Sequence, residues 1–409
     1  MSQAVYILGG YQTDFAKNWS RAGEDISHIT HDAVHGVLQA CRLEASEIQS
    51  IHVGNAFAEL QRGQAHMGAM PATVVPQLYG VPAMRHEAAC ASASVAVLAA
   101  MSEIEAGRYD CVLVLGVEEE RNTSGDQASL NMNAAAWVGH EQLPGRLPWP
   151  SAFGQIAAEY QRRYGLDRRH LHRIAELNFG NAKRNPHAQT RGWQFDAKSF
   201  TDDDAVNPVV EAGIRRNECC QITDGACAVV LASENFARAH AQQRGVTLTK
   251  VPRILGWGHR TSDLPFAHKL KRTTDAELVF PHVNDAVRDA LRRAGCESPT
   301  QVDGYEVHDC FALSEYFAID HIGLTPPGQS WRMVESGDIE LGGRLPINPS
   351  GGLIGGGHPV GATGTRMLLD ACKQVTGEAG DYQVEGARTF ATLNIGGSLG
   401  TVVSFVVGV

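Results

Sequence analysis

A glycine-rich stretch at residues 348–366 holds a single histidine, His358, in a position suited to chemistry. Almost every position before His358 is glycine or another small or turn-forming residue, and Pro359 follows it. Glycine is favoured where backbone adopts positive φ or lies close against a ligand, whereas proline fixes the backbone. Residues 362–375 carry apolar side chains at helical spacing, so the loop is predicted to lead into a helix. We interpret His358 as a rigidly held general base; the alternative is a glycine-rich turn with an incidental histidine.

A base of this kind needs a nucleophile, and Cys90 is the candidate. It begins a stretch rich in Ala, Ser and Val, residues 90–106, which has the composition of a tightly packed helix. The dipole and unpaired amides of a helix N-terminus are expected to lower the pKa of the Cys90 thiol. The alternative is a buried structural cysteine, but a thiol together with the imidazole of His358 favours nucleophilic catalysis.

A second reactive set lies where a predicted strand at 302–307 ends. His308 and Cys310 leave the sheet at the carboxyl end of that strand, where α/β folds usually build their sites. His308 can donate a hydrogen bond to a carbonyl oxygen, and Cys310 can carry a proton. The alternative is that Asp309 caps a helix while the histidine and the cysteine belong to the core. No further ligands follow at regular spacing, so we expect no metal site.

The loop at 394–400 follows another predicted buried strand and is rich in glycine. Its exposed backbone N–H groups can build an oxyanion hole together with the amide of Cys90. We take Gly396 as the contributor from this loop.

Strands alternate with helices along the chain, which indicates an α/β layered fold. Each half closes with a pair of continuous apolar runs, the pattern of strands buried on both faces. Each half also carries its reactive side chain, Cys90 or His358, at the head of a helix of small residues. We interpret this as a weak internal duplication, in which two like layers back to back bring the two helix heads to one place. The strand pairs are 111–115 with 227–231, and 389–393 with 402–406.

Between the strands of the first pair, residues 118–207 are polar and rich in Arg, His and Asn. Helical patterns at 153–164 and 169–184 make this segment an excursion from the layered fold rather than a linker.

Composition excludes several classes of protein. The 409 residues are 43% hydrophobic and 20% charged, which is ordinary for a soluble globular protein. The formal net charge of -10 disfavours nucleic acid as a partner. No apolar run approaches the roughly 20 residues that span a bilayer. Nine irregularly spaced cysteines without a secretory signal predict a reducing, cytoplasmic location.

Together these motifs make the chain resemble the thiolase superfamily over essentially its whole length. Cys90-Ala-Ser resembles the Cys-x-Ser nucleophile motif of that family, and Gly357-His358-Pro359 its Gly-His-Pro motif. His308-Asp-Cys-Phe311 resembles the block of the sterol carrier protein type, where classical thiolases have Asn-Glu-Ala-Phe. Classical thiolases carry a second catalytic cysteine in a C-terminal Cys-x-Gly motif, and Asn394-Ile-Gly396 stands there instead. The resemblance therefore implies that Cys310 takes the role of that second cysteine.

The resemblance also implies an architecture, a five-layered αβαβα fold with two duplicated halves and an inserted loop domain. Because the chain ends at Val409, we expect no fused sterol carrier domain. The expected parts are an N-terminal half at 1–120 continued at 208–250, a loop domain covering coenzyme A at 121–207, and a C-terminal half at 251–409. The loop domain concentrates positive charge, and Arg184 and Arg191 are the predicted ligands of the coenzyme A phosphates; a solvated helix face is the alternative.

The implied activity is CoA-dependent cleavage of a 3-ketoacyl-CoA to acyl-CoA and acetyl-CoA, or the reverse Claisen condensation, through an acyl-cysteine intermediate. The enzyme would be an acyltransferase of lipid metabolism, active in beta-oxidation. Coenzyme A and acyl-CoA would be substrates, with no cofactor bound permanently. Thiolases are typically dimers or tetramers through the N-terminal sheet, so the resemblance implies a homodimer or homotetramer.

Two alternatives stay open. A ketoacyl synthase-like condensing enzyme also uses a cysteine with two general-base groups, but it has no use for Cys310 as a proton shuttle. Some relatives of the sterol carrier protein type act as aldolases or acyltransferases only with a small zinc-ribbon and OB-fold partner. A non-catalytic binder is disfavoured because four reactive residues are retained together: Cys90, His308, Cys310 and His358.

Overall fold

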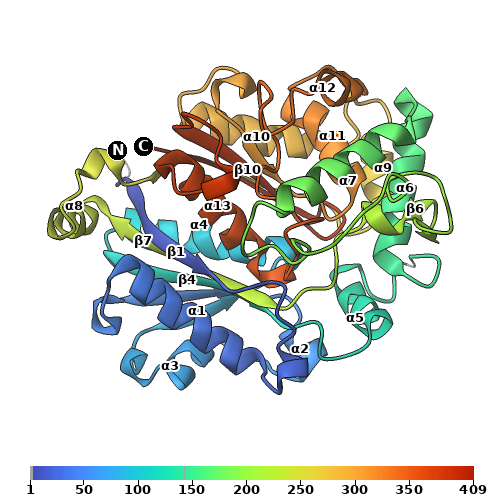
Figure 1. Cartoon of the computed structure of the whole chain (residues 1–409). Helices are drawn as coiled ribbons and strands as arrows, with labels where there is room; N and C mark the ends of the chain where they lie inside the picture. Colours follow the sequence, from blue (N-terminus) through green and yellow to red (C-terminus); the bar gives the residue numbers. More distant parts are fainter. Residues whose placement is uncertain (1–2, 142) are drawn as a thin grey trace.

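The computed structural model describes residues 3–141 and 143–409. Nine of its strands form one hydrogen-bonded sheet in the order β3-β2-β4-β7-β1-β8-β11-β10-β9. The first five strands of that order come from the N-terminal half and the last four from the C-terminal half (Figure 1). The bounds are β1 Val5–Gln12, β2 Ser50–Gly54, β3 Ala83–His86, β4 Cys111–Glu118, β7 Gly225–Ser233, β8 Arg253–Thr261, β9 Tyr305–Val307, β10 Thr389–Gly396 and β11 Thr401–Gly408.

Both predicted strand pairs are confirmed. β4 and β7 are antiparallel, with Val112 opposite Leu231, and every residue of both strands is buried. β10 and β11 are antiparallel in the same way, with Ala391 opposite Val406. Continuous apolar runs produce these strands because both faces of the sheet are covered by helices.

The two halves of the sheet meet at a narrow junction. Between β1 and β8 the pairing is limited to Tyr6 opposite Arg253. A single pair of residues leaves the two halves free to turn away from one another and to enclose helices between them. The expected two sheets are therefore present, joined along one edge.

Helices cover both outer faces and fill the space between the halves (Figure 1). The outer helix α1 (Ile26–Cys41) packs against the N-terminal strands, and α10 (Pro281–Arg293) and α11 (Ala312–Ile322) pack against the C-terminal strands. The central helices α4 (Ser92–Glu105) and α13 (Thr363–Thr376) share one apolar cluster with strands of both halves. This order of helix, sheet, helix, sheet, helix is the expected five-layered αβαβα fold.

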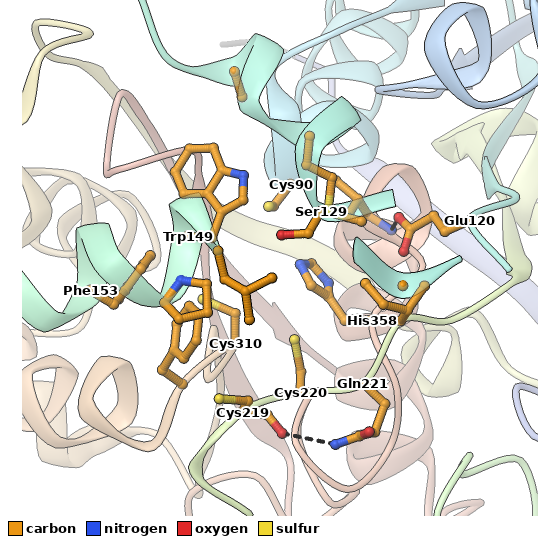
Figure 2. Close-up of a pocket in the computed structure, with 18 of the residues that line it drawn as sticks. Cys90, Glu120, Ser129, Trp149, Phe153, Cys219, Cys220, Gln221, Cys310 and His358 are labelled. Atoms are coloured by element: carbon orange, nitrogen blue, oxygen red, sulfur yellow. Dashed lines mark hydrogen bonds between the residues drawn. The ribbon is translucent and has the colours of Figure 1, made fainter. Parts of the chain in front are cut away.

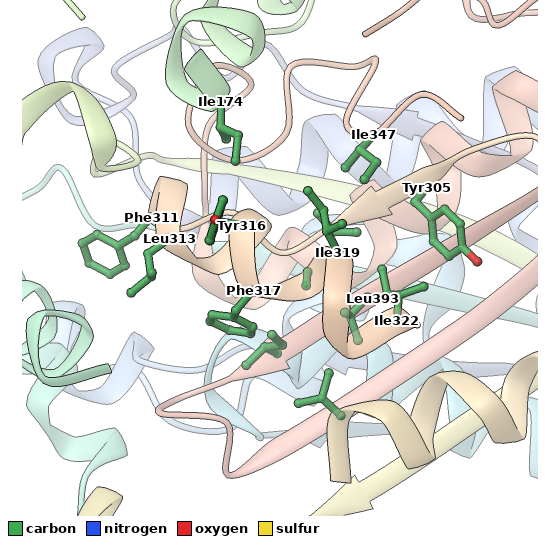
Figure 3. Packing of buried hydrophobic residues seen from close by; sticks show 14 of the residues in the cluster. Ile174, Tyr305, Phe311, Leu313, Tyr316, Phe317, Ile319, Ile322, Ile347 and Leu393 are labelled. Atoms are coloured by element: carbon green, nitrogen blue, oxygen red, sulfur yellow. The ribbon is translucent and has the colours of Figure 1, made fainter. Parts of the chain in front are cut away.

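Helix α11 is buried along its whole length, unlike an ordinary amphipathic surface helix. Figure 3 shows its apolar side chains pointing both toward the strands and away from them. On the far side α7 covers it, and Ile174 of α7 belongs to the same apolar cluster as Tyr316 and Ile319. Because α11 begins two residues after Cys310, its full burial fixes the start of the helix and the reactive block before it.

The excursion between β4 and β7 is built from helices and one small hairpin, with bounds α5 Gly125–Met132, α6 Pro148–Tyr164, α7 Arg168–Ala182, β5 Val209–Glu211 and β6 Ile214–Arg215. Phe153 and Tyr160 of α6 join the C-terminal apolar cluster, so the excursion packs onto the C-terminal half. The domain boundaries at 120, 207 and 250 remain predictions.

The remaining helices are short or peripheral, with bounds α2 Ala58–Arg62, α3 Met70–Val74, α8 Glu234–Gln243, α9 Phe266–Arg272 and α12 Trp331–Ser336. Among the helices of residues 3–141 and 143–409, none has the length and apolar character needed to cross a membrane.

Candidate active site

Cys90 lies in a tight turn that precedes α4 rather than in the helix itself. The turn spans Ala89–Ala91, and Ala89 adopts a left-handed conformation with φ 48°. Residues with a Cβ rarely adopt this conformation, so surrounding contacts must hold it. Ser92 does so from the first turn of α4, since its hydroxyl accepts from the amide of Ala88 at 3.0 Å and donates to the carbonyl of Ala89 at 2.6 Å. The turn directs the Cys90 sulfur into a cavity (Figure 2).

The expected lowering of the Cys90 pKa is wrong. Burial raises the pKa of the thiol to about 12, although the backbone N–H groups of Gly397 and of Cys90 itself pull it down. The nearby carboxyls of Glu120 and Glu118 raise it further. Desolvation of a thiolate in this enclosed place outweighs the amides at the head of α4. Cys90 is therefore a neutral thiol at rest and needs a base.

The position and the protonation state of His358 suit the role of that base. Its backbone N–H donates to Thr223 Oγ1 at 2.9 Å, and its Nδ1 lies 2.6 Å from Thr363 Oγ1. The Thr363 hydroxyl donates to the Pro359 carbonyl at 3.2 Å, so it accepts a hydrogen from Nδ1. The free lone pair is then on Nε2. Burial lowers the pKa of His358 to about 3, with Arg366 adding to the effect, so the ring is neutral at physiological pH.

His308 holds the opposite tautomer. The side-chain amide of Asn394 lies with Nδ2 3.1 Å from His308 Nδ1, while Asn394 Oδ1 accepts from the Ser94 hydroxyl at 2.7 Å. An amide N–H donating to Nδ1 requires the ring hydrogen on Nε2. Burial and the neighbouring His358 lower the pKa of His308 well below its usual value. His308 therefore offers a neutral Nε2–H donor.

The predicted residues converge. Ligand-type atoms of Cys90, His308 and His358 all lie within 4.8 Å of one another. The two imidazole rings are 5.2 Å apart between centroids and nearly perpendicular. A cysteine and two histidines are also zinc-type ligands, but the two tautomers match a base and a donor, which acyl transfer requires.

Cys310 lines the same cavity and is buried. Its Sγ lies 3.7 Å from the hydroxyl of Ser314, and burial raises its pKa well above the usual value for a thiol. Asp309 does not cap a helix. It accepts from the amides of Leu353 and Ile354 and so anchors the glycine-rich loop that carries His358.

The cavity residues without a role assigned from the sequence include Cys219 and Cys220. Both line the cavity, and the amide of Cys220 donates to the carbonyl of Cys310 at 2.9 Å. The adjacent pair therefore forms a wall beside Cys310 (Figure 2). The sequence gives no signal for this contact, because 90 residues separate the two segments along the chain.

The cavity has a volume of about 280 Å³ and a mainly apolar wall. Its apolar lining includes Phe57, Met132, Trp149, Phe153, Phe311 and Val360. Glu120 is the buried carboxyl among the lining residues, whereas Asp126 and Arg216 lie exposed at the rim.

The glycine loop after β10 reaches the Cys90 turn as expected. A Cβ on Gly396 would overlap the carbonyl oxygen of Ala88, so only glycine allows this approach. The amide of the next residue, Gly397, interacts with the Cys90 thiol, and Gly397 lines the cavity. The oxyanion hole assigned to Cys90 and Gly396 remains a prediction, to which the structure adds the amide of Gly397.

Arg184 and Arg191 lie apart from this cavity. Both line a separate surface pocket with Lys373 and Tyr382, and Arg191 is paired with Asp14 at 2.7 Å. The arginine that does line the cavity is Arg216, which is exposed. The sequence marked the excursion as basic without showing which arginine faces the cavity.

Comparisons with known proteins agree with this geometry. Residues 5–235 match the family model described as "Thiolase, N-terminal domain", and residues 267–409 match "Thiolase C-terminal domain-like". The acetyl-CoA acetyltransferase of Methanothermobacter thermautotrophicus is 30% identical over 398 residues, covering 97% of each chain. Human sterol carrier protein 2 is 30% identical over 399 residues, covering 96% of this chain and 70% of its own.

Solved structures share the fold. The "Ltp2-ChsH2(DUF35) aldolase" aligns with a TM-score of 0.79 at 19% identity, covering 100% of this chain and 98% of its own. Human mitochondrial 3-ketoacyl-CoA thiolase aligns with a TM-score of 0.69 at 18% identity, covering 99% and 98%. The family models cover more than half of the chain. The chain belongs to the thiolase family and resembles the sterol carrier protein type within it.

Proposed function

We propose that this thiolase-family acyltransferase cleaves a 3-ketoacyl-CoA with coenzyme A to give acetyl-CoA and a shortened acyl-CoA, or runs the reverse condensation. The supporting observation is the cluster of Cys90, His308 and His358 within 4.8 Å, with the two histidines in opposite tautomers. One ring accepts a proton and the other donates a hydrogen bond, and both tasks are needed to break a carbon–carbon bond next to a thioester.

The first half of the reaction acylates the enzyme. His358 Nε2 takes the proton of Cys90, and the thiolate attacks the keto carbon of the substrate. The amides of Cys90 and Gly396, helped by that of Gly397, hold the negative charge that develops on the keto oxygen. The bond between the keto carbon and the carbon bearing the thioester breaks, and acetyl-CoA leaves as its enolate. His308 Nε2–H and the protonated His358 stabilise the enolate oxygen.

The second half returns the enzyme to its starting state. The Cys310 thiol protonates the enolate carbon, and the resulting thiolate deprotonates incoming coenzyme A. The coenzyme A thiolate attacks the acyl group on Cys90, and the Cys90 sulfur leaves and recovers its proton from His358. The raised pKa of Cys310 supports this role, because it keeps a proton available on the sulfur at neutral pH.

Coenzyme A would enter from the rim where Arg216 is exposed. A guanidinium at that position suits a phosphate, because Arg binds phosphate oxygens with paired N–H groups. Cytoplasmic location, a role in beta-oxidation and assembly as a homodimer or homotetramer belong to the same proposal.

A thiolysis panel of 3-ketoacyl-CoA esters, from acetoacetyl-CoA to branched and aromatic chains, tests the activity. Wild-type protein should consume coenzyme A, and mass spectrometry should find an acyl group on Cys90. Cys90→Ala should abolish both signals, whereas a Cys90→Ser variant with near wild-type turnover would exclude the assignment. Cys310→Ala should lose several orders of magnitude in a thiolase; a ketoacyl synthase would barely respond.

An aldolase that acts with a partner subunit is the second candidate, supported by the alignment with the "Ltp2-ChsH2(DUF35) aldolase". Aldol cleavage breaks a bond beside a hydroxyl group and needs no covalent nucleophile. Cys90→Ala should therefore spare it while removing thiolysis. Full activity of a single purified chain would exclude an obligatory partner.

A further inference from the structure

One carboxyl group of the cavity has no task in the reaction above. Glu120 follows β4, is 1% exposed and lines the cavity together with Cys90 and His358 (Figure 2). The surrounding wall is mainly apolar, and the other acidic lining residue, Asp126, is exposed at the rim. A carboxyl in such a place costs free energy unless it has a structural or a binding role.

Of the two carboxyl oxygens of Glu120, Oε2 makes the longer and weaker hydrogen bond. Oε1 accepts from the amide of Val360 at 3.1 Å, and Oε2 is 3.5 Å from the amide of Thr223. Both recorded partners are donors. Within the described residues no acceptor is hydrogen-bonded to this carboxyl group.

The surroundings of Glu120 favour its neutral form. Burial raises its pKa well above the usual value, and the carboxyls of Glu118 and Asp224 raise it further, because neighbouring like charges resist ionisation. Its own backbone amide donates to Asp224 Oδ1 at 2.8 Å, which keeps the two acidic groups close. A protonated carboxyl needs an acceptor for its hydrogen, and among the described residues the hydrogen bonds of Glu120 supply donors only.

Glu118, two residues earlier, shows what a purely structural carboxyl looks like here. It accepts from the amides of Ala56 at 2.8 Å and Gly361 at 3.0 Å, and from the Asn55 side chain at 2.9 Å. Glu118 ties the loop after His358 to β4 and does not line the cavity. Glu120 makes fewer and longer hydrogen bonds than Glu118 does, and it faces the cavity.

We propose that Glu120 is a specificity-determining residue that donates a hydrogen bond to a neutral oxygen, a hydroxyl or carbonyl, on the acyl group of the substrate. The proposal rests on the proposed function and names its substrate class: 3-ketoacyl-CoA esters whose acyl part is bulky and apolar and carries an additional oxygen. The apolar wall accommodates the hydrocarbon, and Glu120 selects the oxygen. Anionic acyl groups are disfavoured, because the Glu118–Glu120–Asp224 cluster already resists negative charge.

The test compares matched pairs of 3-ketoacyl-CoA esters of equal length, one with a plain alkyl chain and one with a hydroxyl at successive carbons. The measured quantity is the ratio of kcat/KM for the hydroxylated ester to that for the alkyl ester. Wild-type protein should favour one hydroxylated ester. Glu120→Met, which keeps the volume but removes the donor, should lower the ratio by about 10- to 100-fold, since an unpaired polar group in a closed site is strongly penalised.

Two further variants separate specificity from folding. Glu120→Gln retains an N–H donor and an acceptor for Val360, so it should keep most of the preference. Glu118→Gln alters the same acidic cluster outside the cavity, so it is expected to leave the ratio unchanged whatever it does to absolute rates. Thermal unfolding of each variant identifies losses caused by misfolding.

Defined results overturn the inference. An unchanged ratio in Glu120→Met, or a wild-type enzyme that treats both esters alike, means that Glu120 does not select oxygen. Preference for an ω-amino chain would show an ionised carboxylate that selects a cation, which also contradicts it. Absence of thiolysis with every ester, acetoacetyl-CoA included, is a different result, because it removes the proposed function itself.

Discussion

At the scale of single residues, the side chains of Cys90 and His358 are both neutral before substrate binds. The Cys90 thiol has its pKa raised to about 12 and His358 has its pKa lowered to about 3, both chiefly by burial. A resting thiolate–imidazolium pair would need the reverse order of the two values. In the proposed reaction, the proton moves to His358 when a substrate supplies an electrophile and the predicted oxyanion hole receives the charge.

Because the pKa of Cys90 lies above that of His358, the structure predicts how the alkylation of Cys90 depends on pH in the absence of substrate. Because the thiol titrates far above neutrality, its thiolate fraction rises about tenfold per pH unit on approaching the pKa from below. Iodoacetamide labelling of Cys90, followed by mass spectrometry, should accelerate continuously from about pH 6 to about pH 9. A Cys90→Ser chain gives the background of the other cysteines. A plateau beginning near neutral pH would reveal a preformed ion pair and contradict the prediction.

Asn394 provides a second test at this scale, because its amide sets the tautomer of His308. Asn394→Leu removes the donor to Nδ1, so the Nε2–H is no longer fixed toward the substrate. We expect kcat to fall about 10-fold or more with little change in KM, since loss of an oxyanion donor costs about 10² to 10³ in rate. Asn394→Asp should be worse, because a carboxylate accepts from Nδ1–H and leaves Nε2 without its hydrogen.

The control for the Asn394 variants is the rate of Cys90 alkylation, which involves His358 rather than His308. Cys90 and His358 do not contact Asn394 through the recorded hydrogen bonds, so Cys90 alkylation should proceed at the wild-type rate in both variants. Equal losses in alkylation and turnover would indicate a general distortion of the site rather than a tautomer effect.

The sequence identified the reactive side chains but not their protonation. Cys90, His308, Cys310 and His358 stand in motifs that are visible in one chain. The pKa of Cys90 was mispredicted because it depends chiefly on burial of the thiol, and sequence proximity to a helix does not report that burial. The tautomers depend on Thr363 and Asn394, whose hydrogen bonds exist only in the folded chain.

At the scale of elements, the crossing of α4 and α13 brings Cys90 and His358 together. A Cβ on Gly364, in the first turn of α13, would overlap the amide nitrogen of Ser94 in α4. Backbone atoms cannot move aside as a flexible side chain does, so the two helices approach this closely only with glycine at 364.

Gly364→Ala should therefore separate the two helices. We expect the free energy of unfolding to fall by about 1–3 kcal/mol, the usual cost of overpacking a core, and kcat to fall with it. Gly180→Ala is the matched control, because Gly180 is exposed in α7 with no atom near its Cβ position. That replacement should be neutral or stabilising by about 0.5–1 kcal/mol. Denaturant unfolding of both variants measures the difference, and equal stability of the two would refute the close-crossing argument.

Elements with strong apolar patterns were predictable, and short exposed ones were not. The buried strands β4, β7, β10 and β11 have long apolar or small-residue runs that leave little choice of structure. β3 was not predicted, because its four residues, Ala-Met-Arg-His, are partly or fully exposed and show no alternation. The helices α5 and α9 were missed because they are short and their sequences are largely polar.

At the scale of the whole molecule, β3 is the exposed end of the sheet. It pairs with β2 on one side, and within the described residues no strand pairs with its other side. Met84 in this strand is 40% exposed, and Tyr79 just before it is 90% exposed. Unpaired edge strands with apolar side chains readily pair with another chain. A second copy related by a twofold axis would extend the sheet through β3 and cover these side chains.

Met84→Glu should convert the expected homodimer to a monomer, because two like charges would face each other across the twofold axis in an apolar interface. Size-exclusion chromatography with light scattering measures the mass directly. Val246→Glu adds the same charge at a comparably exposed position, 39%, in the loop after α8, far from β3 along the sheet order, and should leave the mass unchanged. Dimers that persist in Met84→Glu would place the interface away from the β3 edge, and a wild-type monomer would contradict the expected homodimer.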